Sequence, residues 1–163
     1  MLNICLQKTW KEFRLDVAFE IPRGKVTALF GHSGAGKSSI LRIISGLETA
    51  DGGMISYGKE VWFGEAQRIH LPPQQRSIGF VFQDFALFPH LTVERNVAYG
   101  IKGKKRLNEL KDLISLVGLS GYERYCPAQL SGGQKQRVAL IRALARKPDI
   151  LLPNGLDLDA FPS

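Results

Sequence analysis

The feature that most constrains this chain is a glycine-rich stretch close to its N-terminus. Residues 31–38 read Gly-His-Ser-Gly-Ala-Gly-Lys-Ser and match the pattern G-x-x-x-x-G-K-S/T at every fixed position. Lys25–Phe30, just before it, is a β-branched and apolar run that predicts a buried strand. Ser38–Leu47, just after it, has apolar residues at a helical period. A strand, a glycine-rich loop and a helix in this order predict a site for nucleotide phosphates.

The residue types of this loop explain the expected chemistry. Glycines let the backbone curl until successive N–H groups point at phosphate oxygens, and the following helix adds the positive end of its dipole. Lys37 is expected to reach the β- and γ-phosphates, while the hydroxyl of Ser38 is expected to ligate Mg²⁺. The loop alone does not distinguish a kinase, a GTPase and an ATPase. The candidate nucleotide-binding residues are Gly31, His32, Ser33, Gly34, Ala35, Gly36, Lys37, Ser38 and Ser39.

Hydrophobic patterning divides the rest of the chain into short strands and helices. Strands are indicated where apolar and polar residues alternate, or where turn residues bound an apolar run. Helices are indicated by apolar residues at a helical period together with a cap residue or a closing glycine. The expected strands are Leu2–Leu6, Phe13–Ile21, two within Met54–Phe63, Ile78–Phe82 and Asp149–Leu152; the expected helices are Thr92–Tyr99, Leu107–Val117 and Ser131–Ala145. This order predicts an α/β core with a mostly parallel sheet.

A second helix start is also suited to anions. Leu130 is followed by Ser131, Gly132, Gly133 and Gln134. A serine hydroxyl at the cap, two glycines that leave the backbone N–H groups accessible and the helix dipole favour a negatively charged ligand. A chain with one phosphate loop gains little from another that points elsewhere. The arrangement makes sense if the second loop binds the nucleotide held by a neighbouring subunit.

With these two motifs, the chain resembles the ABC ATPase family, which supplies the ATP-binding subunits of ABC transporters, from about residue 2 to residue 152. The resemblance implies an α/β fold of the P-loop NTPase type, with an ABC-type ATPase core, a small antiparallel β subdomain and an inserted helical subdomain. By this resemblance, residues 1–163 form part of an ATP-binding domain. The implied parts are a nucleotide-binding core with the β subdomain (1–83), the helical subdomain (84–130), the signature helix and the start of the Walker B strand (131–152), and a divergent tail (153–163).

The resemblance also implies roles for particular residues. Family members form head-to-tail dimers with two ATP molecules between phosphate loop and signature loop, so Ser131, Gly132, Gly133 and Gln134 would contact the γ-phosphate of the partner's ATP. Gln83 matches the family glutamine that senses Mg²⁺ and the attacking water, and would act with Lys37 in catalysis and with Ser38 at the metal. An aromatic residue stacks on adenine in this family. Trp10 is the first candidate here and Phe13 the second.

The segments around Gln83 look like the importer branch of the family. The runs Val81–Asp84 and Leu87–Val93 match that branch, in which this region receives a coupling helix from a membrane permease. Residues 31–39, 71–76 and 81–93 look most like molybdate or tungstate importer ATPases, although iron, sulfate and polyamine importers share much of them. The implied function is an ABC-type transport ATPase that couples ATP hydrolysis to oxyanion uptake. The implied location is the cytoplasmic face of the membrane, with Mg²⁺, ATP, a permease and a second copy as partners.

The sequence departs from the family after the last expected strand. Family members continue through leucine, aspartate, glutamate and proline, where the aspartate holds Mg²⁺ through water and the glutamate polarises the attacking water. Without gaps, Pro153, Asn154, Gly155 and Leu156 stand there. Asn154 is a poor substitute for a carboxylate near a divalent cation, and Gly155 has no side chain to act as a base. Pro153 would remove a ladder N–H from a central strand. The sequence therefore predicts impaired hydrolysis.

An alignment with four residues deleted leads to the same expectation. Leu156-Asp157 would then match the end of the family's D-loop, and the acidic pair would still be missing. Asp157 and Asp159 are expected to lie in a tail. Because Ser163 comes before the switch histidine and the last core strands of the family, the interpretation is a C-terminally truncated form with an incomplete core sheet.

Composition limits the alternatives. Hydrophobic residues make up 44% and charged residues 23%, the balance of an ordinary globular domain, and no apolar run approaches the ~18–20 residues that span a bilayer. The formal charge of +7 is scattered except at Lys102, Lys104, Lys105 and Arg106, which a solvated loop explains without nucleic acid. Two cysteines without a metal-type spacing predict free thiols.

Two other functional classes remain open. One is a catalytically dead ATP-binding fragment or interaction protein. The other is a non-transport ABC ATPase, which the short, heptad-free interval between Ser38 and Ser131 disfavours.

Overall fold

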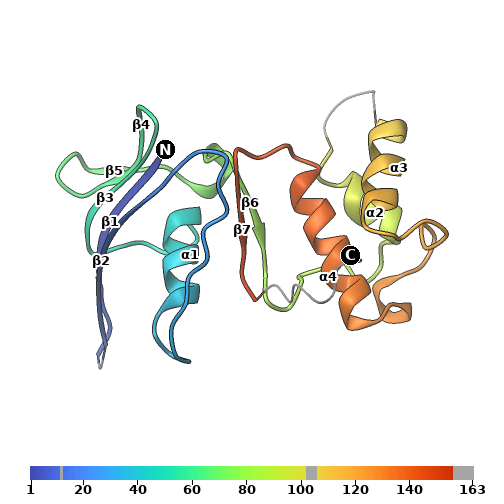
Figure 1. Ribbon diagram of the computed structural model, residues 1–163, viewed down its shortest axis with the longest axis horizontal. Helices are drawn as coiled ribbons and strands as arrows, with labels where there is room; N and C mark the ends of the chain where they lie inside the picture. Colours follow the sequence, from blue (N-terminus) through green and yellow to red (C-terminus); the bar gives the residue numbers. More distant parts are fainter. Residues whose placement is uncertain (12, 102–105, 156–163) are drawn as a thin grey trace. The chain divides into compact units, whose positions relative to one another are not determined.

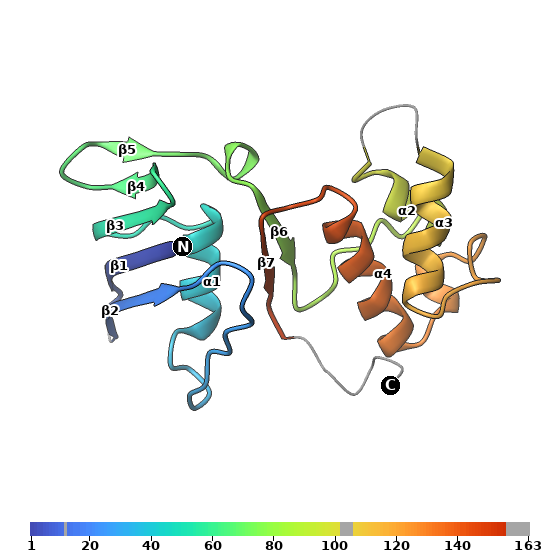
Figure 2. The same cartoon turned by 45° about the horizontal axis from the view of Figure 1, so that its top comes forward.

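The computed structural model describes residues 1–11, 13–101 and 106–155, with the side chains of 106 and 107 excepted. The chain separates into two compact units, Met1–Arg76 and Ser77–Ser163. Each unit has its own sheet and helices, which Figures 1 and 2 label.

The first unit is built on an antiparallel sheet of five strands in the order β2-β1-β3-β4-β5. The strands are β1 (Leu2–Thr9), β2 (Arg14–Ile21), β3 (Gly52–Tyr57), β4 (Glu60–Gly64) and β5 (Ile69–His70), and the helix α1 spans Lys37–Ser45. A 3-10 turn at Pro73–Gln75 follows the last strand. The expected strands and helix of this unit are therefore confirmed, apart from the one discussed below.

Alternation of side chains gives this sheet one apolar face. In β1, Leu2, Ile4 and Leu6 are buried while Cys5 between them is exposed. The pairing runs from Leu2 opposite Ile21 to Thr9 opposite Arg14, and β3 pairs on the other side of β1. A slip of one residue would move every apolar side chain of β1 to the other face, so burial fixes the register. In both views α1 lies beside the β1 and β2 strands (Figures 1 and 2).

The prediction of a strand at Lys25–Phe30 is wrong. These residues have no strand pairing, and the side chains of Val26 and Phe30 are 101% and 93% exposed relative to the reference state. A β-branched run forms a strand only when a neighbouring strand accepts its ladder hydrogen bonds. Within the described part of the first unit, the five strands pair with one another and none pairs with this segment.

The second unit contains a pair of parallel strands, β6 (Ile78–Val81) and β7 (Ile150–Pro153), with three helices between them in sequence. The helices are α2 (Val93–Ala98), α3 (Arg106–Leu116) and α4 (Gly132–Leu144), and a 3-10 turn spans Pro127–Gln129. Parallel neighbours need such a crossover connection. In both views α4 lies between the strand pair and the other two helices (Figures 1 and 2).

Sequence and structure agree on these elements. Thr92 caps α2 by accepting a hydrogen bond from the backbone of Arg95, as the pattern predicted. One apolar cluster joins α2, α3 and α4, with Val97, Ile114 and Ile141 among its fully buried members. Pro153 is the last residue of β7, and the ladder continues because the Asn154 N–H donates to the Val81 carbonyl at 3.0 Å. Both cysteines are free thiols.

None of the described helices combines the length and the apolar composition that crossing a bilayer requires.

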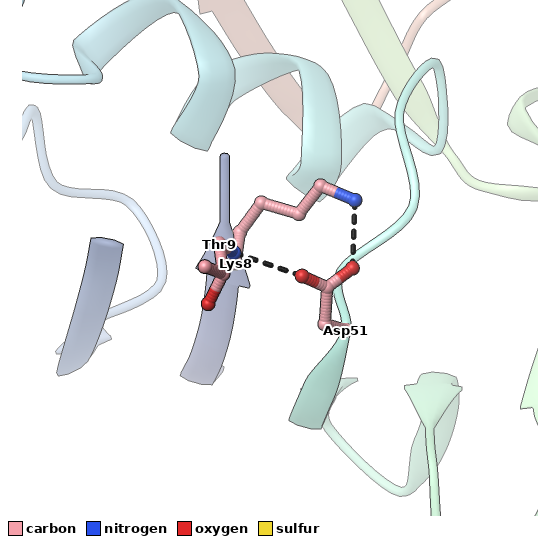
Figure 3. Close-up of polar contacts among 3 residues, drawn as sticks. All are labelled: Lys8, Thr9 and Asp51. Atoms are coloured by element: carbon pink, nitrogen blue, oxygen red, sulfur yellow. Dashed lines mark hydrogen bonds and ion pairs between the residues drawn. The ribbon is translucent and has the colours of Figure 1, made fainter. Parts of the chain in front are cut away.

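Asp51 closes the turn that leads from α1 into β3. Its carboxylate accepts a hydrogen bond from Lys8 Nζ at 2.7 Å and one from the Thr9 backbone N–H at 2.8 Å (Figure 3). Its own N–H donates to the Gln7 carbonyl at 2.8 Å. The hydrogen bond from Lys8, followed by the one from Thr9, lowers the pKa of Asp51 from its ordinary value. The ionised side chain therefore ties the end of β1 to the start of β3.

Replacing Asp51 by asparagine removes this ionisable partner, and we expect a lower melting temperature at pH 7. A carboxyl group whose pKa is lower in the folded state contributes stability that is present above its unfolded pKa and lost as the pH falls through its folded pKa. The difference between wild type and Asp51→Asn should therefore shrink below pH 3.8 and disappear at lower pH. Thermal melts across this range measure it. The exposed Asp112 of α3 provides a matched control, and a difference that persists at pH 2 would contradict the account.

Candidate functional site

The phosphate loop turns tightly into the start of α1. Gly34 and Gly36 have φ angles of 82° and 80°, a region that favours glycine, and Gly36 is the N-cap of the helix. The Ala35 N–H donates to the His32 carbonyl at 3.2 Å, which closes a turn within the loop. The first turn of α1 contains no acidic side chain. The start of α1 therefore offers its N–H groups and dipole to an anion.

Lys37 reaches back across this loop. Its Nζ donates to the carbonyls of Gly31 and His32, each at 2.8 Å. The ammonium group thus lies over the segment whose backbone would surround a phosphate. This geometry fits a triphosphate, because the lysine can exchange carbonyl oxygens for phosphate oxygens without leaving the loop.

Two aromatic side chains lie next to the phosphate loop. Trp10 and Phe13 stand at the β1–β2 turn, with ring centroids 5.7 Å apart and planes inclined by 27°. A Cβ placed on Gly36 would lie 3.1 Å from the Phe13 ring, so this ring contacts the last glycine of the loop. Both candidates for adenine stacking are therefore near the loop, and Phe13 is the one in contact with it. Their stacking role stays a prediction.

The other end of α1 is held by a buried arginine, Arg76. Its side chain is only 4% exposed, and its guanidinium donates to the carbonyls of Ile43 and Ile44 at 2.9 and 2.6 Å. It also donates to the carbonyls of Leu71 and Trp62 and lies 5.9 Å from the centroid of the Trp62 ring. Burial lowers the pKa of Arg76 to about 10, so it stays charged at neutral pH. A cation at the C-terminal carbonyls of α1 is favoured by the helix dipole.

The signature sequence forms the start of α4. Ser131 is the N-cap: its hydroxyl accepts a hydrogen bond from the Gln134 N–H at 3.2 Å, while its own N–H donates to the Gln134 side-chain oxygen at 2.8 Å. Ser131 and Gly132 are exposed, and a Cβ on Gly132 would meet no atom within 4 Å. This helix start is therefore open on the side where Gly132 lies, as a ligand on a neighbouring subunit would require.

Gln83 follows β6 and is exposed. At the end of the neighbouring β7, Gly155 has a φ angle of 75°, and a Cβ there would lie 3.1 Å from Gln83 Cγ. The positions after β7 thus face the candidate glutamine, but Pro153, Asn154 and Gly155 bring no carboxylate to it. Leu156, Asp157 and Asp159 lie outside the described residues.

Sequence reasoning missed the contacts that hold the turn after Gln83. Phe85 and Ala86 both have positive φ angles, 64° and 43°, which cost roughly 1–2 kcal/mol each for residues with a Cβ. Arg142 of α4 donates to both of their carbonyls, at 3.0 and 2.8 Å. The buried side chain of Asn96 in α2 bonds the backbone of Phe88 in both directions. No sequence pattern predicted these contacts: Arg142 bonds carbonyls 56 and 57 residues away, and Asn96 bonds the backbone of a turn eight residues before it.

The structure distributes the predicted residues over both units. The first unit contains Trp10, Ser39 and the whole phosphate loop, and the second contains Gln83 and the signature residues. In the described part of the chain, no group of three or more His, Cys, Asp or Glu side chains could hold a metal ion. Ser38 and Gln83 remain the predicted Mg²⁺ ligands.

Comparison with known proteins agrees with this fold and these motifs. Residues 15–154 match the family described as ABC transporter. The sulfate/thiosulfate import ATP-binding protein CysA of Nocardia farcinica is 50% identical over 143 residues, which are 84% of this chain and 41% of that protein. The molybdenum import ATP-binding protein ModC of Vibrio parahaemolyticus is 45% identical over 153 residues, which are 93% of this chain and 41% of that protein.

A solved structure shows the same fold. The ATP-binding cassette MJ0796, solved as a dimer in a post-hydrolysis state bound to ADP and Pi, aligns with a TM-score of 0.79 and 30% identity. The alignment covers 98% of this chain and 78% of that one.

A phosphate loop at the start of α1 and a signature helix at α4, on an α/β fold with an antiparallel β subdomain, define an ATP-binding cassette. The chain belongs to the ABC transporter family. It spans about two fifths of the length of the curated relatives CysA and ModC, 41% in each case.

Arg76 offers a test of how α1 is held. Lysine keeps the charge but cannot donate to four carbonyls from a planar fork. We expect Arg76→Lys to lower the free energy of unfolding by about 2–4 kcal/mol, because buried carbonyls lose their donors. Arg42→Lys, on the exposed side of the same helix, should change it by less than about 0.5 kcal/mol. Urea unfolding measures both, and equal stabilities of the two variants would contradict this role of Arg76.

Proposed function

We propose that this chain is the ATP-binding subunit of an ABC importer for an oxyanion. The observation that carries the proposal is the presence of two anion-binding helix starts, the phosphate loop at α1 and the open signature at α4, on one cassette fold. One would bind the chain's own ATP and the other would bind the ATP of a second copy. The names of the relatives, sulfate/thiosulfate and molybdenum import proteins, support an importer.

Binding depends on groups that the first unit already holds in place. The N–H groups of the loop and of the first turn of α1 would donate to phosphate oxygens, and Lys37 would move from the carbonyls of Gly31 and His32 to the β- and γ-phosphates. The Ser38 hydroxyl would ligate Mg²⁺, and Trp10 or Phe13 would stack on adenine. Bound ATP supplies the phosphoryl group, and Mg²⁺ neutralises part of its charge.

The partners follow from the same geometry. Ser131 to Gln134 would contact the γ-phosphate held by a second copy, which makes a head-to-tail homodimer with two ATP molecules. The cassette MJ0796, a dimer in its solved structure, supports such an assembly. A membrane permease would dock near Gln83 and the segment that follows it. The complex would then lie at the cytoplasmic face of the membrane.

Molybdate and sulfate are both compatible with the proposal. Both are tetrahedral oxyanions, and relatives named for molybdenum and for sulfate import match this chain at similar identity. In a transporter of this kind, the membrane and binding subunits select the oxyanion. We retain molybdate as the proposed substrate, because the phosphate loop and the segments around Gln83 look most like those of molybdate importers.

A second candidate function is favoured by one observation. Asn154 and Gly155 stand where the family has its Mg²⁺-holding aspartate and its water-polarising glutamate. A chain with these residues would bind ATP and assemble without turning it over. In that case it acts as a regulatory or interaction subunit.

The phosphate loop can be tested by ATP binding. We expect Lys37→Ala to weaken ATP binding by at least about 100-fold, since the β- and γ-phosphates lose their charged partner. Lys25→Ala removes an exposed lysine from the same stretch of chain and should leave the affinity within about twofold. Equilibrium titration with a fluorescent ATP analogue measures both. Equal affinity for the ATP analogue in Lys37→Ala and wild type would contradict the assignment of this loop as a phosphate-binding site.

The residues after β7 predict very slow hydrolysis. Loss of a general base alone removes about 10²–10⁴-fold in rate, and the Mg²⁺-holding carboxylate is replaced as well. We therefore expect phosphate release from Mg²⁺-ATP no faster than in Lys37→Ala, with or without a permease. A full-length importer ATPase of the same family serves as the positive control. Robust hydrolysis by this chain would refute the prediction and direct attention to Asp157 and Asp159.

A further inference from the structure

Arg142 of the signature helix bonds the turn that carries Gln83, and Phe85 of the same turn packs against the cluster of Val81, Ala139 and Ala143. The guanidinium donates through Nη1 to the Ala86 carbonyl at 2.8 Å and through Nη2 to the Phe85 carbonyl at 3.0 Å. Its central carbon lies 5.4 Å from the centroid of the Phe88 ring. These contacts connect the last turn of α4 to the segment that begins two residues after Gln83.

This segment needs an external partner to keep its shape. The Phe85 N–H donates to the Phe82 carbonyl at 2.9 Å, which closes a tight turn around Gln83 and Asp84. The next two φ angles are positive at Phe85 and Ala86, a conformation that residues with a Cβ rarely adopt unless the surroundings fix it. A planar guanidinium can donate to two carbonyls at once, and a lysine cannot do so with the same geometry. Arg142 is therefore suited to hold this conformation.

A separate contact holds the following residues. The Asn96 side chain, fully buried in α2, accepts from the Phe88 N–H and donates to the carbonyls of Phe88, Leu91 and Thr92. Asn96 thus attaches residues 88–92 to α2. Arg142 attaches residues 85 and 86 to α4 through its hydrogen bonds to their carbonyls.

The opposite end of α4 is the signature. Ser131 caps the helix, and Arg142 lies eleven positions later in the same α4, which spans Gly132–Leu144. The helix is continuous between these two ends. We therefore expect a displacement of its N-terminus to be carried to Arg142.

We propose that Arg142 is a positioning residue for Gln83, which it ties to the signature helix. When Ser131 and its neighbours close on the nucleotide of a second copy, α4 carries Arg142 with it, and the turn at Gln83 follows. Each chain would in this way report the occupancy of the partner's site to the glutamine of its own. The inference rests on the proposed function, because it uses nucleotide binding by the signature of a second copy.

The hydrogen bonds from Arg142 to Phe85 and Ala86, called the anchor below, can be tested without any nucleotide. Hydrogen exchange of single backbone amides is measured by NMR in wild type, Arg142→Lys and Arg137→Lys. Arg137 is the matched control because it lies on the same helix and donates to the Val117 carbonyl, away from Gln83. We expect the Phe85 amide to exchange at least tenfold faster in Arg142→Lys. The Asn96 amide in α2 should stay within twofold, which separates local loosening from general unfolding.

The link to chemistry is tested with ATP at saturation, with and without Mg²⁺. In wild type, Mg²⁺ should slow exchange of the Phe85 amide further, since Gln83 then has a ligand. Arg142→Lys should bind ATP within about threefold of wild type and lose this Mg²⁺ response, and Arg137→Lys should keep it. A variant with only a structural defect would change the ATP affinity and the Mg²⁺ response together.

The possible outcomes distinguish a failure of the anchor from a failure of the proposed function. The anchor is overturned if the Phe85 amide in Arg142→Lys stays within twofold of wild type, or if Arg137→Lys accelerates it equally. Retention of the Mg²⁺ response in Arg142→Lys overturns the coupling to Gln83. If wild type itself binds no ATP, the proposed function fails and the coupling fails with it, while the nucleotide-free comparison still decides the anchor.

Discussion

The first N–H groups of an α-helix have no carbonyl partner within the helix, and for that reason two helix starts of this chain are suited to an anion. At α1 the N-cap is Gly36, which has no side chain to compete for them, and the first turn contains no acidic residue. At α4 the N-cap is Ser131, and the next two residues are glycines. The remaining features serve to hold these two helices: Arg76 closes the C-terminal carbonyls of α1, and the apolar cluster around Val138 and Ile141 fixes α4.

The two helix starts differ in the contacts that order them before a ligand binds. In α4, Ser131 and Gln134 satisfy each other's backbone N–H groups, so the signature is ordered before any phosphate arrives. In α1 the ordering element is Lys37, whose ammonium group bonds the carbonyls of the loop itself. A phosphate at α1 would therefore replace the contacts of the Lys37 side chain, whereas a phosphate at α4 would meet a helix start that is already capped. The second arrangement suits a ligand delivered by another subunit, because little has to be reorganised on closure.

Local signals in the sequence predicted α1, α2 and α4 well, because caps and helical periods are properties of neighbouring residues. The strand at Lys25–Phe30 was wrong because a strand depends on a partner that the segment itself does not specify. Arg76, Asn96 and Arg142 could not be identified for a similar reason. Arg76 and Arg142 donate to carbonyls more than thirty residues away, and Asn96 donates to carbonyls of a turn four to eight residues before it. The sequence does not indicate which backbone groups an arginine or asparagine will bond. The predicted role of residues 31–38, in contrast, follows from eight consecutive residues and stays a prediction.

The proposed binding and the proposed chemistry depend on different parts of this chain. Binding would use backbone N–H groups and Lys37, whose positions follow from the loop and α1. Chemistry would depend on side chains after β7. The backbone there is regular: β7 pairs in register with β6 through Pro153, and the Asn154 N–H continues the ladder to Val81. Gly155 lies close to Gln83: a Cβ there would be 3.1 Å from Gln83 Cγ, so a larger residue would require a small shift of the glutamine side chain.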